Sequence, residues 1–335
     1  MKPYLVDVPV KINIWIRPDC QRQQFEVIKK ARPSILFIQS DGGRNNNEWK
    51  LINQNRELYE YGIDWQCKVF HIYENYNNGL YTMAQKTSSL IWNTVDRCIF
   101  FEDDQIPAVS YFRFCAELLE KYKDDERVEC ICGRNQLGIS ENVSSDYFFS
   151  RQGSIWGAAT WKRVIQNRTF EYGKDPYIMN LLKNSTKHDP IIWRRLKTYA
   201  YDKLCDGHIA GGEFWFEFDM HAQSRVQIIP KKNMISNIGF TSNSAHATTW
   251  DNLSSKTKKL FNTKIYEINF PLKHPIYVIP DLDFEKKRNK LLNRNQSKIQ
   301  KIINNIFRFI HYLKKGDFVT IKNKIHKIFK SKYEK

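Results

Sequence analysis

The sequence lacks the signature motifs of several large enzyme classes. It has no GxGxxG and no GxxxxGKS/T pattern, which excludes a Rossmann dinucleotide site and a P-loop. It also has no GxSxG and no HExxH, which excludes an α/β-hydrolase nucleophile and a zincin metal site. Residues 17–20 (RPDC) follow the first expected strand, so the glycine-rich basic loop of a sugar nucleotidyltransferase is missing as well.

The sequence also lacks the cysteine pattern of a disulfide-bonded or zinc-binding protein. Its seven cysteines are odd in number, none forms a CxxC pair, and several lie in apolar segments. This pattern favours reduced thiols in a cytosolic protein. The N-terminal residues lack the apolar core of a signal peptide, and no run approaches the roughly 20 apolar residues that cross a bilayer. We therefore expect a cytoplasmic protein.

Positive charge is distributed unevenly along the chain. The 335 residues carry a formal net charge of +17, and residues 286–335 hold 16 Lys or Arg against Asp317 and Glu334. This terminal stretch therefore carries +14, which leaves +3 for residues 1–285. The body of the chain is nearly neutral, and its length allows one large or two small domains with a sizeable core.

Apolar runs and helical patterns alternate through the first third of the chain. This order predicts an α/β fold with a mostly parallel central sheet and helices on both faces. The expected strands are 8–16, 34–40, 67–72 and 98–101, and the helices between them end near residue 32 and cover 47–61 and 80–95. Later we expect a helix ending near 122, a strand at 128–133, a loop-rich stretch at 134–160, helices at 160–205 with breaks at Pro176 and Pro190, a helix within 206–223, a strand at 226–230 and a loop from 237.

Three consecutive acids follow the fourth expected strand. Glu102, Asp103 and Asp104 end a buried apolar run, where uncompensated carboxylates are costly. Ligands of open α/β sheets gather outside the carboxyl ends of the strands, and Mg2+ or Mn2+ often joins protein carboxylates to substrate phosphates. Two interpretations of the triplet alone stay open: a metal–diphosphate site and a solvated acidic turn.

Other polar residues fall at the same predicted sheet edge. Arg17 and Asp41 follow the first two strands, and Asn78-Gly79 opens the helix after the third. Because the carboxyl ends of parallel strands converge, these residues could bind the ribose and base of a nucleotide beside the triplet. Taken singly, Arg17 could form a surface ion pair and Asp41 could shape a turn. Their joint position favours the metal–diphosphate interpretation.

An ordered set of short segments carries a resemblance to a known family. The segments are Arg17-Pro18, Ser40-Asp41-Gly42, Phe101-Glu102-Asp103-Asp104 with Pro107, WGAATW at 156–161, PKKN at 230–233 and NIGF at 237–240. Over roughly residues 8–250 the chain resembles GT-A type glycosyltransferases, and its EDD triplet is similar to that of the N-acetylglucosaminyltransferase I group. More specifically, it resembles a bacterial haemolytic-protein-like group of nucleotide-sugar transferases found in surface polysaccharide pathways.

The resemblance implies a hexosyl- or N-acetylhexosaminyltransferase that uses a nucleotide-sugar donor, a UDP-sugar foremost, with Mn2+ or Mg2+. Asp104 would bind the cation directly. Asp103 would face the ribose or a metal-bound water, and Glu102 would lie near the sugar or support the loop. Asp41 and Arg17 would contact the nucleoside.

The resemblance also implies roles for later residues. His246 matches a histidine that reaches back to the metal or diphosphate, with a polar loop histidine as the alternative. Glu213 occupies the place of a general base that deprotonates the acceptor hydroxyl, and Glu217 and Asp219 are rivals one turn further along. Three tryptophans could stack on a sugar face or belong to the core: Trp156, Trp161 and Trp215.

The C-terminal stretch combines apolar and basic residues at helical spacing. Such basic amphipathic helices bind anionic membrane surfaces, which suits a peripheral protein on the inner face of the plasma membrane with a lipid-linked acceptor. Packing on the body or on a second subunit is the alternative. The residues expected at the membrane are Ile302, Ile306, Phe307, Ile310, Lys314 and Lys315.

The sequence therefore predicts two parts. Residues 1–285 are expected to form a GT-A domain, with a nucleotide-sugar half at 1–133 and an acceptor half at 134–285, and residues 286–335 a basic helical tail. The expected reaction is an inverting sugar transfer to a glycan acceptor in bacterial surface polysaccharide synthesis. The alternatives are a retaining transferase on the same fold and a nucleic-acid-binding protein that uses the tail. The second is disfavoured because the charge is confined to the tail and no nucleic-acid-binding motif is present.

Overall fold

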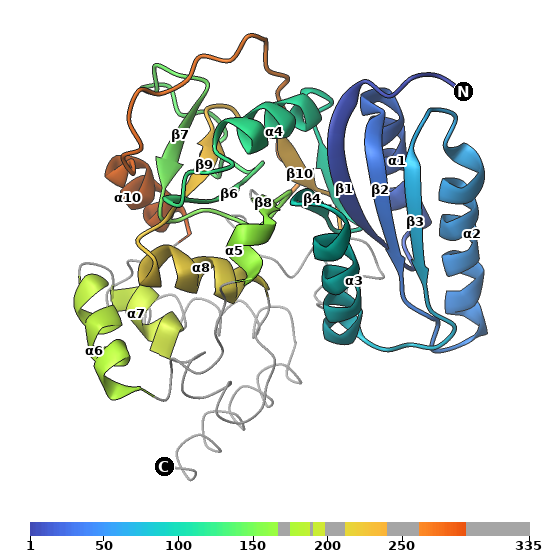
Figure 1. The fold of residues 1–335 in the computed structure, drawn as a ribbon, viewed down its shortest axis with the longest axis horizontal. Helices are drawn as coiled ribbons and strands as arrows, with labels where there is room; N and C mark the ends of the chain where they lie inside the picture. Colours follow the sequence, from blue (N-terminus) through green and yellow to red (C-terminus); the bar gives the residue numbers. More distant parts are fainter. Residues whose placement is uncertain (167–174, 188–189, 198–211, 240–260, 293–335) are drawn as a thin grey trace, which may run out of the picture. The chain divides into compact units, whose positions relative to one another are not determined.

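The computed structural model describes residues 1–166, 175–187, 190–197, 212–239 and 261–292 (Figure 1). The described residues up to Arg288 belong to one compact unit, Met1–Arg288. In chain order their helices and strands are β1 (Val6–Ile14), α1 (Pro18–Ala31), β2 (Pro33–Ser40), α2 (Asn46–Gly62), β3 (Lys68–Tyr73), α3 (Leu80–Thr94), β4 (Arg97–Phe101), β5 (Gln105–Pro107), α4 (Ser110–Lys121), β6 (Val128–Ile131), β7 (Tyr147–Ser150), β8 (Ala159–Trp161), α5 (Lys162–Gln166), α6 (Pro176–Ser185), α7 (Pro190–Lys197), α8 (Gly212–Ala222), β9 (Val226–Pro230), β10 (Ile235–Asn237) and α10 (Leu282–Leu291).

Eight of these strands form one sheet in the order β3-β2-β1-β4-β8-β6-β9-β7. The first four are all parallel, because β1 pairs in parallel with β2 and β4, and β2 pairs in parallel with β3. The strand β8 runs antiparallel between β4 and β6, and β9 lies parallel to β6 and antiparallel to β7. The chain therefore has the predicted α/β fold with a mostly parallel central sheet.

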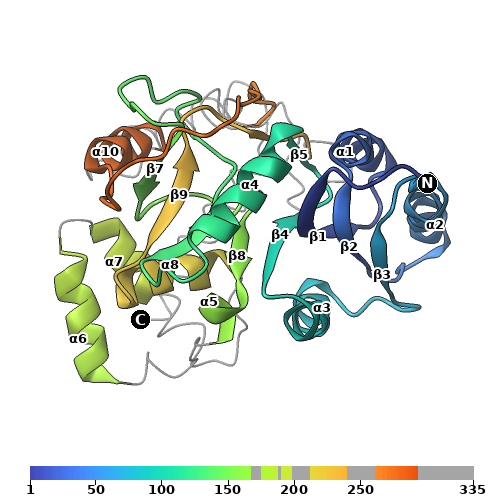
Figure 2. The ribbon, with the colours of Figure 1, turned by 45° about the horizontal axis from the view of Figure 1, so that its top comes forward.

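Helices cover both faces of the sheet (Figure 2). Successive side chains of a strand point to opposite faces, so one strand feeds two cores. On β2, Leu36 and Ile38 join the core with α1, α2 and α4, whereas Phe37 joins Ile91 and Trp92 of α3. The ring of Phe37 also stacks on that of Phe70 of β3. Because helices pack on both faces of the sheet, the strands are held in place together with the polar residues that follow them.

A second, two-stranded sheet joins β5 to β10 in antiparallel register. Asn237 pairs with Gln105, so the segment after β10 lies directly beside the acidic triplet. From the sequence, a loop was expected from residue 237, and β5, β7, β8 and β10 were not predicted. These strands have only three or four residues, which is too short for an alternating pattern to be recognised.

Two prolines were predicted to break the helical stretch at 160–205, and a separate helix begins at each of them. Pro176 and Pro190 are the first residues of α6 and α7. The first helical turn has no intrahelical partner for its N–H groups, so a residue without an N–H fits there. Asp175 caps α6 by accepting a hydrogen bond from the backbone N–H of Tyr177 at 2.8 Å.

The helix α10 continues across the predicted boundary between residues 285 and 286. The division of the chain into a domain at 1–285 and a tail at 286–335 stays a prediction. In the described part of the chain, no helix has the length and apolar character needed to cross a membrane.

Candidate functional site

The predicted site residues follow strands that are neighbours in the sheet. Ile14 at the end of β1 pairs with Ser40 at the end of β2, and Ile12 pairs with Phe101 at the end of β4. Adjacent strands lie about 4.8 Å apart. The segments that follow the three strands therefore begin side by side at the carboxyl edge of the sheet.

Arg17 and the acidic triplet are directly bonded. The Arg17 Nη1 donates to Asp104 Oδ2 at 2.7 Å and contacts Asp103 Oδ1 at 3.3 Å. The Asn237 Nδ2 donates to Asp104 Oδ1 at 2.8 Å. Both carboxylate oxygens of Asp104 are therefore hydrogen-bonded, one to a charged and one to a neutral donor.

The backbone of the acidic turn is held by two buried glutamines of α1. The Gln24 Nε2 donates to the carbonyls of Glu102 at 2.7 Å and Gln105 at 2.6 Å, and the Gln21 Nε2 donates to the carbonyl of Asp103 at 2.9 Å. Neither glutamine was predicted from the sequence to support the site. Their signal was present, because Gln21 and Gln24 are polar side chains on the same side of a helix as Phe25.

The segment after β10 packs tightly against the triplet. The backbone N–H of Ile238 donates to the carbonyl of Asp104 at 2.9 Å. A Cβ added to Gly239 would stand 2.0 Å from Asp104 Oδ2, far inside contact distance. Only glycine therefore allows the chain to pass here without moving the Asp104 carboxylate.

Negative charge at the triplet exceeds its local compensation. Although the Glu102 side chain keeps exposed surface, desolvation, followed by Asp104 and Asp103, raises the pKa of its carboxyl to about 7. Desolvation also raises the pKa of Asp103 to about 6, although Arg17 acts in the opposite direction. Burial alone would lower the pKa of Arg17, but Asp103 and Asp104 raise it above its usual value. The site therefore favours additional positive charge.

A second cluster brings together the predicted Asp41, Asn78 and Gly79. Asp41 Oδ1 accepts from the backbone N–H groups of Gly42 and Asn78, both at 2.9 Å, and Oδ2 accepts from that of Gly79 at 2.8 Å. Arg56 donates to the Asp41 carbonyl at 3.4 Å. In this structure Asp41 organises the loop at the N-terminus of α3.

The three candidate bases differ in exposure and partners. Glu213 is exposed in the first turn of α8 and lies close enough to Glu102 to raise the pKa of that carboxyl further. Glu217 is largely buried and pairs with Arg195 Nη2 at 2.9 Å. Asp219 is 5% exposed. Among them, Glu213 combines solvent access with proximity to the triplet.

The predicted stacking tryptophans occupy different surroundings. Trp161 is 3% exposed and its Nε1 donates to the Leu119 carbonyl at 2.9 Å, so its ring packs in the core. Trp156 is partly buried, and the Arg134 guanidinium carbon lies 4.9 Å from the centroid of its ring. The Trp215 side chain, His246 and the six tail residues predicted at the membrane lie outside the described residues.

The triplet has the donor chemistry of a hard-cation site. In the described ranges, no three His, Cys, Asp or Glu side chains already converge on one point. Mg2+-type cations, however, often use one or two protein carboxylates and take their other ligands from water and substrate phosphates. The oxygen-only donors of Asp103 and Asp104, with their uncompensated charge, fit such a cation.

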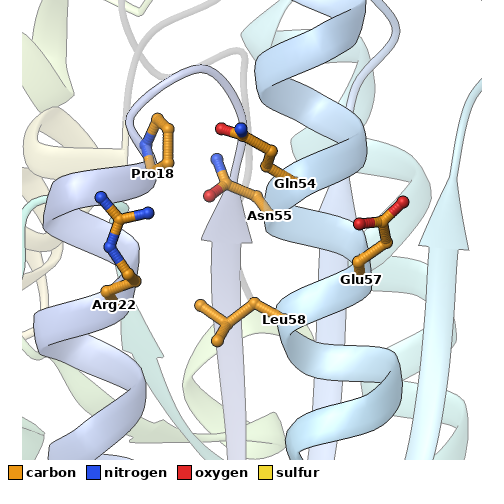
Figure 3. A pocket seen from close by; sticks show the side chains of 6 residues that line it. All are labelled: Pro18, Arg22, Gln54, Asn55, Glu57 and Leu58. Atoms are coloured by element: carbon orange, nitrogen blue, oxygen red, sulfur yellow. The ribbon is translucent and has the colours of Figure 1, made fainter.

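A pocket of about 350 Å3 lies between α1 and α2 (Figure 3). Its lining includes Pro18, next to Arg17, and Asn55, whose side chain points from α2 toward α1. The Asn55 Nδ2 donates to the Trp15 carbonyl at 2.7 Å, while its Oδ1 has no hydrogen-bond partner among the described residues. The pocket thus adjoins the loop that carries Arg17, and no residue in its lining was predicted to belong to the site.

No protein-family model and no curated protein matches the chain. Among solved structures, the chain is similar to mannosyltransferase PcManGT from Pyrobaculum calidifontis in complex with GDP-Man and Mn2+. The two are 12% identical, the match covers 66% of this chain and 70% of that chain, and the TM-score is 0.37. At this identity and TM-score, the likeness assigns neither a fold nor an activity to this chain.

Proposed function

We propose that this chain is a metal-dependent GT-A type glycosyltransferase that moves a sugar from a nucleotide-sugar donor to a glycan acceptor. One observation carries the proposal. Arg17, Asp103 and Asp104 are bonded together at the carboxyl edge of a parallel sheet, where ligands of such sheets bind. The Asp41 cluster follows the next strand along the same edge.

The nucleoside would lie between these two groups. Asp41, Asn78 and Gly79 offer a fixed loop with polar groups for the ribose and base. Arg17 would contribute a cation, because a guanidinium can bind two oxygens of a diphosphate at once. Glu102, which keeps exposed surface, would face the transferred sugar.

Asp104 would bind Mn2+ or Mg2+ directly, and Asp103 would face the ribose or a metal-bound water. When bound, the cation neutralises the negative charge that collects on the departing diphosphate. The protein residues would keep the donor in one orientation and limit the access of water to it.

Glu213 would act as the general base of an inverting transfer. The acceptor hydroxyl would form a bond to the anomeric carbon as the bond to the diphosphate breaks, and its proton would pass to the Glu213 carboxylate. The exposure of Glu213 on α8, close to Glu102, supports this choice over Glu217, which pairs with Arg195. A retaining transferase on the same fold would not need Glu213.

The finer parts of the proposal rest on the sequence. A lipid-linked glycan acceptor, a UDP-sugar donor and a role in bacterial surface polysaccharide synthesis follow from the resemblance. Attachment to the inner face of the plasma membrane follows from the basic tail.

A thermal-shift screen of nucleotide-sugars with and without Mn2+ tests the proposal. A ligand at about 100 times its Kd should stabilise the folded protein by about 2.7 kcal/mol, and only when Mn2+ is present. Asp104→Ala should abolish the Mn2+-dependent part of the shift. Stabilisation by no nucleotide-sugar, or an unchanged shift in Asp104→Ala, would contradict the assignment.

A transfer assay with the donor found in the screen tests the base. Glu213→Gln should lower kcat by about 100-fold or more while leaving the donor-dependent thermal shift intact. Wild-type kcat in this variant would favour the retaining alternative.

A further inference from the structure

Asp104 is held in place from three sides. Its backbone carbonyl accepts from Ile238, its Oδ1 accepts from Asn237, and Gly239 packs against its Oδ2. The carboxylate therefore has little freedom to turn toward or away from a ligand. A cation that binds Asp104 therefore has to bind on the side toward which the carboxylate already points.

That position is taken by Arg17 in this structure. The Arg17 Nη1 stands 2.7 Å from Asp104 Oδ2, and the side chains of the pair are 12% and 13% exposed. A guanidinium stays protonated over the whole working pH range, so it cannot give way by losing its charge. A divalent cation and the guanidinium would then face each other at one oxygen in a site with little water, where Coulomb repulsion is strong.

Arg17 is the partner that can move. It precedes α1 as the N-cap residue, and its side chain makes no capping hydrogen bond. Its described polar contacts go to Asp103 and Asp104 alone. Once displaced, the guanidinium would be a poorly hydrated cation without an anion, which is unfavourable until an anionic ligand arrives.

We propose that Arg17 occupies the cation position on Asp104 in the free protein and is released by the cation to bind the diphosphate of the donor. This inference rests on the cation and nucleotide-sugar site proposed above. Its consequence is cooperative binding: the cation alone must break the Arg17–Asp104 ion pair, whereas the cation with a nucleoside diphosphate gives Arg17 a new partner. By linkage, each ligand must raise the affinity for the other by the same factor.

Isothermal titration calorimetry of the full chain with Mn2+ alone tests the first half. Arg17→Met should bind Mn2+ about tenfold more tightly than wild type, because no ion pair has to break. Arg17→Lys should lie between the two, since a lysine keeps the charge without the planar fork of donors. Arg22→Met, in the helix that follows Arg17, is the matched control, because Arg22 is exposed and pairs with Asp19. Its Mn2+ affinity should equal that of wild type.

Titration with UDP in saturating Mn2+ tests the second half. Arg17→Met should bind UDP about tenfold more weakly, and the factor by which UDP raises the Mn2+ affinity should be smaller than in wild type. An Mn2+ affinity in Arg17→Met and Arg17→Lys that is no higher than in wild type would overturn the inference. If the Arg17 variants bound Mn2+ more tightly than wild type but no variant bound UDP or GDP, the competition between Arg17 and Mn2+ at Asp104 would be supported. The proposed nucleotide-sugar function would then be overturned instead.

Discussion

Lys11 carries a charge inside the central strand of the sheet. It is 7% exposed on β1, between Phe37 of β2 and Phe100 of β4 in the register, and its Nζ donates to Asn13 Oδ1. Burial lowers the pKa of Lys11 to about 8, although Glu102 acts in the opposite direction. Near neutral pH the folded protein therefore holds a charge that the unfolded chain would keep in water.

Replacing this lysine should stabilise the protein in a pH-dependent way. Between pH 8 and 10.5 the unfolded chain binds more protons at this position than the folded protein, so the wild type gains stability as pH rises through that window. Lys11→Met should raise the free energy of unfolding at pH 7 by about 1–3 kcal/mol, and the difference should shrink by pH 10.5. Urea unfolding of both proteins at pH 7 and pH 10.5 measures this difference in the free energy of unfolding.

Lys68→Met is the matched control, because Lys68 is exposed at the start of β3. It should change the free energy of unfolding by less than about 0.5 kcal/mol at either pH. If Lys11→Met raised the free energy of unfolding by the same amount at pH 7 and pH 10.5, the burial of charge would not be the cause of the increase.

At the level of residues, the sequence could identify the groups that stand directly after strands. Arg17, Asp103 and Asp104 are in contact, as are Asp41 and Asn78. Asn237 and Gly239 could not be assigned their contacts, because the pairing of β10 with β5 joins segments more than 100 residues apart. A three-residue strand leaves no pattern from which such a pairing could be read.

Among the elements, α1 does more than cover the sheet. Its residues Gln21 and Gln24 are fully buried and donate to carbonyls of the acidic turn, while Tyr59 of α2 donates to Gln21 Oε1 at 3.0 Å. Two helices thereby fix the path of the turn without contacting its carboxylates. The orientation of the candidate site depends on this packing.

Gln24→Met should separate the support of the turn from its charge. The substitution nearly conserves volume but removes the side-chain donor to the carbonyls of Glu102 and Gln105, while the Glu102 carbonyl keeps the backbone N–H of Gln105 at 3.2 Å. We expect a loss of about 1–3 kcal/mol in the free energy of unfolding. We also expect a several-fold weaker affinity for UDP with Mn2+ in calorimetry.

The exposed Gln23 of the same helix provides the comparison. Gln23→Met should leave both quantities within about 0.5 kcal/mol of wild type. If Gln24→Met kept wild-type stability and affinity, the two glutamine–carbonyl bonds would not position the turn.

Elements with long apolar runs or strong helical patterns were predictable, and short ones were not. The first four strands and the helices between them lie within a few residues of their predicted bounds. The region 134–160 was expected to be loop-rich, yet β7 and β8 complete the sheet there through antiparallel pairing. Their formation depends on partners supplied by β4, β6 and β9, which local sequence cannot specify.

At the scale of the whole molecule, the structure refines where the basic tail can be removed. Arg288 lies before the end of α10, is 5% exposed, and its Nη1 donates to Gln152 Oε1 at 3.3 Å. A deletion from residue 286 would remove this contact together with the tail. A deletion of residues 293–335 keeps α10 and still removes 12 Lys or Arg against Asp317 and Glu334.

The chain without residues 293–335 should lose affinity for anionic membranes while remaining folded. Each basic residue near an anionic surface contributes about 1 kcal/mol to the free energy of membrane binding. Co-sedimentation of the shortened chain with phosphatidylglycerol vesicles at low salt should therefore fall at least tenfold below that of the full chain. Phosphatidylcholine vesicles should bind neither form strongly. The donor-dependent thermal shift should be retained, and unchanged co-sedimentation would contradict membrane attachment through the tail.

The pairing of β5 with β10 also has a consequence for the newly made chain. Asn237 lies 133 residues after Asp104. At about 5–20 residues per second, the ribosome needs about 7–27 seconds to make this stretch. Arg17, Gln21 and Gln24 are made before the acidic turn, so they can bind it at once, whereas Asn237 and Gly239 come last. During synthesis, Asp104 can therefore pair with Arg17 well before the side-chain amide of Asn237 becomes available to it.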